Sequence, residues 1–154
     1  MSGQTAGCKA DRMSCDLPDL LPHRPPMLLL SRLDGFSATG SRATAELREG
    51  NPFLRPDGLL ERAAYAELMA QCFAAGSGAL ARSVGKPPIV RGYLAALRDV
   101  AVHGDARLGE TLAISVDLVA ALSPATMLQG AVRSADRLLA AGRFTIFIPE
   151  KESG

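Results

Sequence analysis

The sequence predicts an α+β domain in which a long, curved antiparallel sheet wraps around a single helix. Three observations lead to this prediction: an almost uninterrupted apolar helical segment over residues 60–84, two strand-like segments before it, and only strand-like segments after it. A helix that is apolar on nearly every side has to be buried, and a curved sheet can cover it. A chain of 154 residues is long enough for one such domain with a substantial core.

The segments before the helix begin with a polar tail. Residues 1–16 show no hydrophobic periodicity, so we expect a disordered N-terminal tail and a folded domain over residues 17–150. Four prolines in the ten residues 17–26 favour turns and extended backbone. A first strand is expected over residues 27–36. A second is expected over residues 40–48, where apolar and polar residues alternate.

Only strands are expected after the helix. Residues 90–102 form one, and apolar residues at every second position from Leu112 to Leu122 form the clearest. Further strands are expected over residues 127–134 and 138–148. Such a sheet cannot close on itself around a helix, so its edges stay open. Pairing the edges of two copies across a two-fold axis would satisfy them, which predicts a homodimer.

Two strongly polar residues, Glu67 and Gln71, interrupt the apolar helix. Their spacing of four places both side chains on one face. A carboxylate in apolar surroundings is costly and usually changes its protonation state instead of remaining ionised. Because chains seldom carry such a cost without a use for it, we expect chemistry at Glu67. The alternative is a helix carboxylate that faces solvent, which is the ordinary position of a Glu.

Composition argues against several classes of function. The net charge is +1 with no basic stripe, and the aromatic residues are five Phe and two Tyr, so nucleic-acid binding is not indicated. No apolar stretch reaches the roughly 20 residues of a membrane-spanning helix, and the N-terminus lacks the apolar core of a secretory signal. Three scattered cysteines and two histidines suit neither a disulfide framework nor a metal centre. We expect a cytoplasmic protein that needs no metal or cofactor.

Three motifs stand out along the chain: LPHRPPMLLLSRLDG at residues 21–35, NPFL at residues 51–54 and AELMAQ at residues 66–71. The first is similar to the segment that opens the 3-hydroxyacyl-acyl-carrier-protein dehydratases of the hotdog superfamily. The second resembles the P-F-F motif of those enzymes, and the third resembles the E-A-x-A-Q of their central helix. The likeness spans about residues 17–150 and is greatest to the short dehydratases of aryl-polyene clusters. It implies a hotdog fold, a (3R)-hydroxyacyl thioester on acyl carrier protein or coenzyme A as substrate, and a role in fatty-acid or polyene-type biosynthesis.

The chain departs from these enzymes where they carry their catalytic histidine. Members with established activity have a G-H-F-P segment just after P-F-F, whereas residues 54–62, LRPDGLLER, contain no His. His23 could act as the base instead. The family, however, carries this same His in addition to its catalytic one, which favours a structural role for it. His103 precedes a Gly-Asp turn, and we expect it at the surface with no role in the site.

Dehydration of a 3-hydroxyacyl thioester needs a base for the proton on the carbon next to the carbonyl, an acid for the departing hydroxyl, and a donor to the thioester oxygen. We expect Glu67 to transfer a proton and Gln71 to hold the substrate hydroxyl or a water molecule. Backbone N–H groups near the helix start, from Gly58 to Arg62, are expected to bind the oxyanion. The expected substrate-binding residues are Asn51, Phe53, Gly58 and Arg62.

Two other functions fit the same residues. A hotdog thioesterase hydrolyses its substrate with one carboxylate and an amide side chain, which Glu67 with Gln71 or Asn51 would supply without a His. The third possibility is a catalytically inactive subunit that binds acyl chains or pairs with an active partner. A hydro-lyase of the dehydratase type is our first expectation, and the thioesterase is the second.

Overall fold

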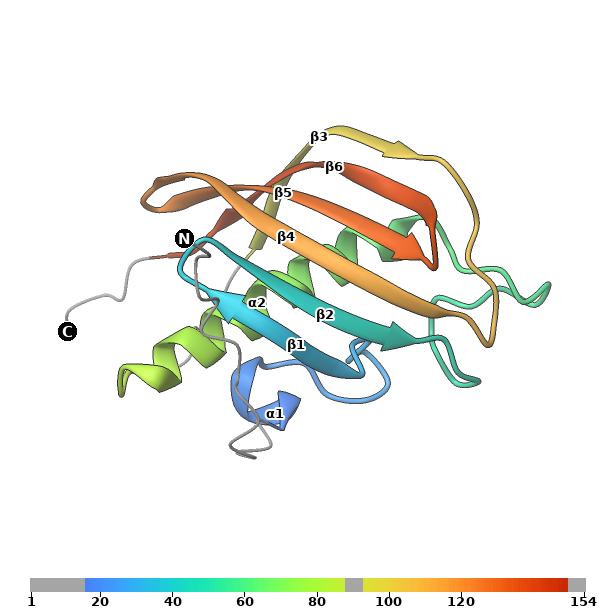
Figure 1. The fold of residues 1–154 in the computed structure, drawn as a ribbon, viewed down its shortest axis with the longest axis horizontal. Helices are drawn as coiled ribbons and strands as arrows, with labels where there is room; N and C mark the ends of the chain where they lie inside the picture. Colours follow the sequence, from blue (N-terminus) through green and yellow to red (C-terminus); the bar gives the residue numbers. More distant parts are fainter. Residues whose placement is uncertain (1–15, 88–92, 150–154) are drawn as a thin grey trace.

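A six-stranded antiparallel sheet curves around one long helix in the computed structural model, which describes residues 16–87 and 93–149 (Figure 1). The helices are α1 (Leu17–Leu20) and α2 (Ala63–Ser83), and the strands are β1 (Arg32–Ser37), β2 (Gly40–Glu46), β3 (Tyr93–Val102), β4 (Thr111–Leu122), β5 (Ala125–Ser134) and β6 (Arg137–Phe147). Two strands, one long helix and four strands follow one another along the chain, as predicted. The α+β fold class is confirmed.

The predicted bounds of the helices and strands differ most from the observed ones in the segment just before the sheet. The first strand begins only at Arg32, because the amide of Leu28 is bonded to Arg24 and that of Leu29 to the side chain of Gln71. Helix α1 lies in the proline-rich segment for which we expected only turns and extended backbone, and its Pro18 occupies the first turn, where proline is tolerated. The tail expected over residues 1–16 falls outside the described residues except for Asp16, and so does the predicted start of the third strand, residues 90–92.

The sheet has the strand order β1-β2-β4-β5-β6-β3, so β1 and β3 are its edges. Its concave face covers α2 with buried side chains that include Leu112, Ile114, Val116, Leu128, Val132 and Phe144. The alternation predicted for β4 holds from Leu112 to Val116. Beyond it, Leu118 and Leu122 are exposed, and the register shifts between Leu118 and Ala120.

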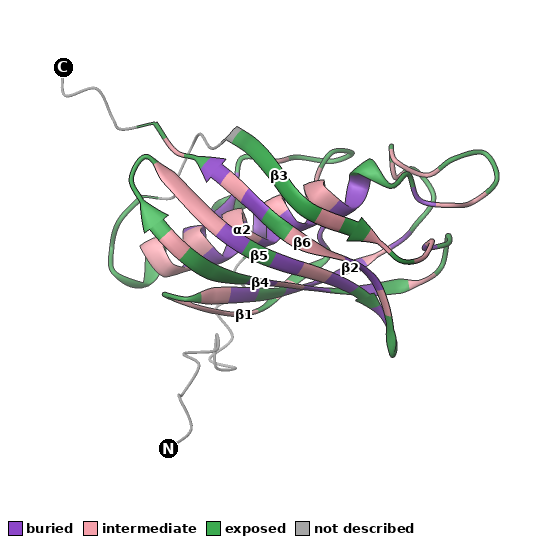
Figure 2. Cartoon of the chain, turned by 90° about the horizontal axis from the view of Figure 1, so that it is seen from above, coloured by how far each residue is buried: buried purple, intermediate pink, exposed green. Residues whose placement is uncertain are grey.

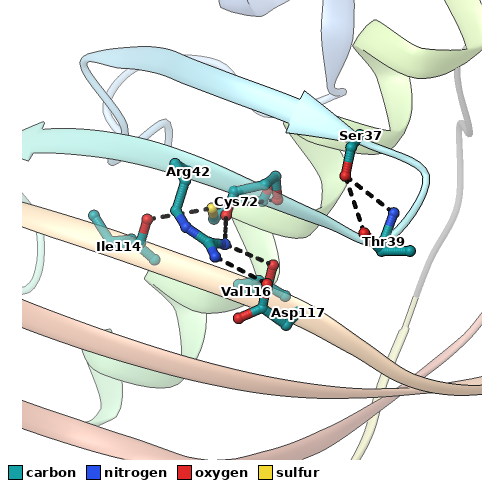
Figure 3. Close-up of polar contacts among 8 residues, drawn as sticks. Ser37, Thr39, Arg42, Cys72, Ile114, Val116 and Asp117 are labelled. Atoms are coloured by element: carbon teal, nitrogen blue, oxygen red, sulfur yellow. Dashed lines mark hydrogen bonds and ion pairs between the residues drawn. The ribbon is translucent and has the colours of Figure 1, made fainter. Parts of the chain in front are cut away.

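Polar contacts hold β2 between α2 and β4. Figure 3 shows Arg42 of β2 donating to the carbonyl of Val116 at 3.2 Å and to the carboxylate of Asp117 at 2.9 Å. On the helix side, the hydroxyl of Ser41 donates to the carbonyl of Cys72 at 2.9 Å. The Cys72 side chain is fully buried, and this burial raises the pKa of its thiol to about 12.

Helix α1 packs directly on α2 at Gly78. A β-carbon at this position would lie 1.9 Å from the carbonyl oxygen of Leu20, so only glycine allows this approach. Because Pro22 and His23 follow α1 within three residues, this contact fixes the start of the segment that carries His23 to the helix.

Edge strand β3 is the most exposed strand of the sheet, as the green colour along it in Figure 2 shows. It pairs with β6 on one side only. Leu94 is 41% exposed and Leu97 is 50% exposed, which leaves apolar side chains beside an unpaired edge. No helix within the described ranges is long and apolar enough to span a membrane.

Candidate active site

Gln71 connects helix α2 to the segment before β1. Its side chain is fully buried, and its amide nitrogen donates to the carbonyl of Met27 at 2.8 Å and to Oε1 of Glu67 at 2.9 Å. Its amide oxygen accepts the backbone N–H of Leu29 at 2.9 Å. Both N–H donors of this side chain are therefore occupied, although we expected the amide to hold the substrate hydroxyl or a water molecule.

His23 lies against the same carboxylate. Its Nε2 is 3.3 Å from Oε1 of Glu67, and the two side chains are 29% and 30% exposed. Its other ring nitrogen, Nδ1, is shielded from solvent and has no hydrogen-bond partner among the described residues. A proton on Nδ1 would lack an acceptor, which costs about 1–3 kcal/mol. A proton on Nε2, by contrast, lies beside the carboxylate of Glu67.

Glu67 is half-buried, not buried as we expected. The reason is the face of α2 on which it lies: Ala70, Phe73 and Ala74 on this face are also half-buried, because the sheet covers the opposite side of the helix more completely. Gln71 donates to Oε1 and Nε2 of His23 lies 3.3 Å from the same oxygen, whereas Oε2 accepts no hydrogen bond from the described residues. The carboxylate is thus held through one oxygen while the other can exchange a proton.

A cavity of about 120 Å³ lies at this carboxylate. It is lined by Pro22, His23, Glu67, Ala70, Phe73, Ala74, Leu94, Ile146 and Ile148. Apart from His23 and Glu67, every side chain in this lining is apolar. A small cavity with two convergent polar groups and apolar walls is typical of a site for an organic substrate.

A larger and more open cavity of about 440 Å³ lies between residues 26–32 and 46–51. Asn51 is part of its lining, together with charged side chains that are paired on the surface, such as Arg48 with Glu46. We place the candidate active site at the smaller cavity, because it contains the His23–Glu67 contact and the larger one contains no comparable pair.

The other predicted substrate-binding residues do not line the cavity at Glu67. Asn51 accepts the backbone N–H of Phe53 at 2.9 Å, which closes a local turn. Phe53 packs against the core, and Arg62 lies 3.6 Å from Asp105. These residues stabilise the loop before α2 in this structure.

Four of the five predicted oxyanion donors are already occupied. The backbone N–H of Gly58 donates to the carbonyl of Arg55, and that of Leu59 donates to the carboxylate of Asp57. The N–H of Leu60 donates to the carbonyl of Ala106, and that of Glu61 donates to the carbonyl of Phe53. None of these four amides is free for a substrate oxygen. The loop uses these four donors to fold back on itself, so the expectation that it binds the oxyanion finds no support at these four amides.

Sequence reasoning missed most of the cavity wall. Ala70 and Ala74 could have been identified, since they follow Glu67 by three and seven residues and lie on its face of the helix. Leu94, Ile146 and Ile148 come from β3 and the end of β6, and no local pattern relates them to Glu67. His103 is exposed, as predicted. In residues 16–87 and 93–149, no group of three His, Cys, Asp or Glu side chains could hold a metal ion.

Comparisons with known proteins agree with this architecture. The dehydratase heterocomplex ApeI:P from Xenorhabdus doucetiae is 25% identical over 88% of this chain and 91% of that one, with a TM-score of 0.81. A hypothetical thioesterase from Streptococcus pneumoniae, solved with coenzyme A, is 14% identical over 79% of this chain and 88% of that one, with a TM-score of 0.61, and shows the shared fold alone. The same holds for the uncharacterized protein PH1136 from Pyrococcus horikoshii, which is 12% identical over 86% and 93% of the two chains, with a TM-score of 0.64.

No protein with curated annotation matches the chain significantly. The family model described as ApeP dehydratase matches residues 15–154, which is nearly the whole chain. This match confirms the resemblance to hotdog dehydratases that the three sequence motifs indicated. The chain belongs to the ApeP-like family of dehydratases.

Proposed function

We propose that the protein acts in the dehydration of (3R)-3-hydroxyacyl thioesters and that Glu67 is its proton-transferring group. The observation that carries this proposal is the arrangement at the carboxylate. Oε1 of Glu67 is held by Gln71 at 2.9 Å and faces His23 at 3.3 Å, whereas Oε2 accepts no hydrogen bond from the described residues. The carboxylate lines an otherwise apolar cavity, where a thioester with an acyl tail can be placed.

The elimination can proceed through this one carboxylate. Oε2 takes the proton from the carbon next to the thioester carbonyl, and the electron pair of that C–H bond forms the new double bond. The bond between C3 and its hydroxyl oxygen breaks, and the hydroxyl leaves as water by taking up the proton that Glu67 has removed, which regenerates the carboxylate. Gln71 and His23 keep Glu67 in place through the oxygen that does not react. They are positioning residues in this scheme.

Among the described residues, four of the five amides expected to donate to the thioester oxygen, those of Gly58 to Glu61, are already bonded. We therefore propose that a second hotdog subunit supplies the donor. Its place would be edge strand β3, where Leu94 belongs both to the exposed edge and to the cavity lining. A subunit that pairs with β3 would therefore lie directly beside Glu67.

We propose a dehydratase subunit as that partner, because the similar structure from Xenorhabdus doucetiae is described as a dehydratase heterocomplex. The homodimer predicted from the open sheet edges is the other arrangement. Native mass spectrometry of the purified chain, alone and mixed with the dehydratase subunit, distinguishes the mixed complex from the homodimer. A stable mixed complex supports our proposal, and a self-associated dimer that does not exchange with the dehydratase contradicts it.

The reaction is tested by the mass of the acyl group. The protein, alone and with the dehydratase subunit, is incubated with a (3R)-hydroxyacyl group on acyl carrier protein and, separately, on coenzyme A. Loss of water from the acyl group supports dehydration and identifies the carrier. Appearance of a free carrier thiol supports the thioesterase, for which a carboxylate with one free oxygen could activate water. An unchanged acyl mass under all conditions points to a subunit without activity.

A further inference from the structure

A second cavity adjoins the candidate site along helix α2. Its volume is about 60 Å³, and it is lined by Ser37, Ala38, Thr39, Gly40, Ser41, Phe73, Gly76, Ser77, Leu80, Val116, Leu118 and Leu128. Phe73 is the residue that this lining shares with the cavity at Glu67. The ring of Phe73 therefore stands at the boundary between the two cavities.

The two cavities follow one another along the helix. The first uses Ala70, Phe73 and Ala74 of α2, and the second continues with Phe73 and the next turns, up to Leu80. At a rise of about 1.5 Å per residue, Phe73 lies roughly 9 Å along the axis from Glu67, and Leu80 lies roughly 20 Å from it. An extended acyl chain with its thioester end at Glu67 would reach Phe73 first and Leu80 only after passing it.

Both cavities offer apolar side chains that can contact a hydrocarbon chain. Beyond Glu67 and His23 the first cavity is apolar, and the lining of the second combines Phe73, Leu80, Val116, Leu118 and Leu128 with the hydroxyl side chains of Ser37, Thr39, Ser41 and Ser77. The first cavity, at about 120 Å³, is well below the ~300–1,000 Å³ of pockets that enclose larger organic ligands. It can take only a short tail by itself. A longer tail needs the space beyond Phe73.

We propose that Phe73 determines the length of acyl chain that the site accepts, as a movable wall between the two cavities. This inference rests on the proposed function, since it assumes an acyl thioester at Glu67. Phe73 is half-buried and packs on the edge of the core, so its ring has more freedom to turn than a fully enclosed side chain. With its ring in the observed position, the tail ends at Phe73. With the ring displaced or removed, the tail extends toward Leu80 and Leu128.

The experiment measures binding, so that it does not depend on turnover. Non-hydrolysable 3-hydroxyacyl-pantetheine amides of increasing length, from butanoyl to dodecanoyl, are titrated into the wild-type protein by calorimetry. Burial of each added methylene contributes about 0.8 kcal/mol, which is roughly a fourfold gain in affinity. We expect this gain to stop at a definite chain length in the wild type. In Phe73→Ala the gain continues for further methylenes, and in Phe73→Trp it stops earlier.

Phe147→Ala is the matched control, because Phe147 is an exposed phenylalanine of β6 that lines neither cavity. In this variant the gain in affinity is expected to stop at the same chain length as in the wild type. Phe73→Leu serves as a second variant if circular dichroism shows that Phe73→Ala does not fold, and it should also lengthen the accepted chain. If the affinity gain stops at the same chain length in the wild type, in Phe73→Trp and in whichever of Phe73→Ala and Phe73→Leu folds, Phe73 does not determine the accepted chain length. Wild-type protein that binds no amide of any length, either alone or in complex with the dehydratase subunit, contradicts the proposed function itself, which is a different result.

Discussion

The buried amide of Gln71 donates to the carboxylate of Glu67 across one turn of α2, at 2.9 Å. The same amide bonds the carbonyl of Met27 and the N–H of Leu29, so it also holds the chain that enters the sheet. One side chain thus positions the carboxylate and the segment that follows His23. Because its hydrogen bonds are all made inside the protein, Gln71 can be fully buried, although Glu67 is not.

Replacement of Gln71 is expected to destabilise the fold. In Gln71→Leu the carbonyl of Met27 and the N–H of Leu29 lose their partner, and each buried unpaired group costs about 1–3 kcal/mol. We expect the free energy of unfolding to fall by about 2–4 kcal/mol, measured by urea denaturation. Gln129→Leu is the control, since Gln129 is exposed on β5 and should change little. Equal midpoints for Gln71→Leu and wild type would refute the role of this amide.

His23→Ala is expected to reduce turnover about tenfold, which corresponds to about 1.4 kcal/mol and is typical of one lost charge-assisted contact. The reason is that His23 contacts Oε1, the oxygen that Gln71 also holds, so the carboxylate keeps part of its support. Initial rates of water loss from the acyl group measure the effect. His103→Ala, at an exposed His, controls for nonspecific effects. A loss as large as that of Glu67→Gln would make His23 the base.

Gly78→Ala tests whether α1 positions the site. In an exposed helix this substitution stabilises by about 1 kcal/mol, because alanine is the better helix former. Here the added carbon would lie 1.9 Å from the carbonyl oxygen of Leu20, so we expect destabilisation of about 1–3 kcal/mol and a loss of activity as His23 shifts. Thermal denaturation and acyl mass measurements report the two effects. Ser77→Ala, one residue earlier on α2, is the control. A gain in stability for Gly78→Ala would contradict the close packing.

The stability of the protein should fall at alkaline pH because of Cys72. The thiol has an ordinary pKa of 9.0, which burial raises to about 12 in the folded protein. Between these values the unfolded chain releases its thiol proton while the folded chain retains it, so the unfolded state binds fewer protons and stability decreases as pH rises. Below pH 9 this contribution is constant.

The decrease that arises from Cys72 is expected to reach about 1 kcal/mol by pH 10. Urea denaturation of wild type and Cys72→Ala between pH 7 and pH 10 measures it, and the difference between the two proteins should narrow by that amount at the alkaline end. A constant difference over this range would show that the thiol does not ionise differently in the two states.

Much of the fold could be predicted from the sequence because its signals are local. The period-two pattern of β4 and the apolar run of α2 each specify their own element, and their order along the chain implies a sheet around a helix. The strand ends at Leu122 as predicted, but its alternation of burial stops after Val116, which the period-two pattern does not show. The late start of β1 was missed because the amide of Leu29 bonds to Gln71, which is 42 residues away.

The site could be predicted only in part. Glu67 was recognisable as a polar residue in an apolar helix, and its position at a cavity agrees with that interpretation. The contact with His23 depends on how α1 packs against Gly78, and the cavity wall at Leu94 and Ile146 depends on strands that reach the site through sheet topology. Local patterns contain none of this information. The half-buried state of Glu67 also follows from the uneven cover of the helix by the sheet.

Glu67→Gln tests the central claim most directly, because it keeps the shape of the side chain and removes the oxygen that can take up a proton. The variant, in the assembly that is active with the wild type, is incubated with the (3R)-hydroxyacyl substrate, and loss of water is followed by mass, with circular dichroism to verify the fold. We predict that the rate falls by a factor of about 10²–10⁴, the usual contribution of a general acid–base group. A folded Glu67→Gln variant that dehydrates the substrate at the wild-type rate would contradict the assignment of Glu67 as the proton-transferring residue.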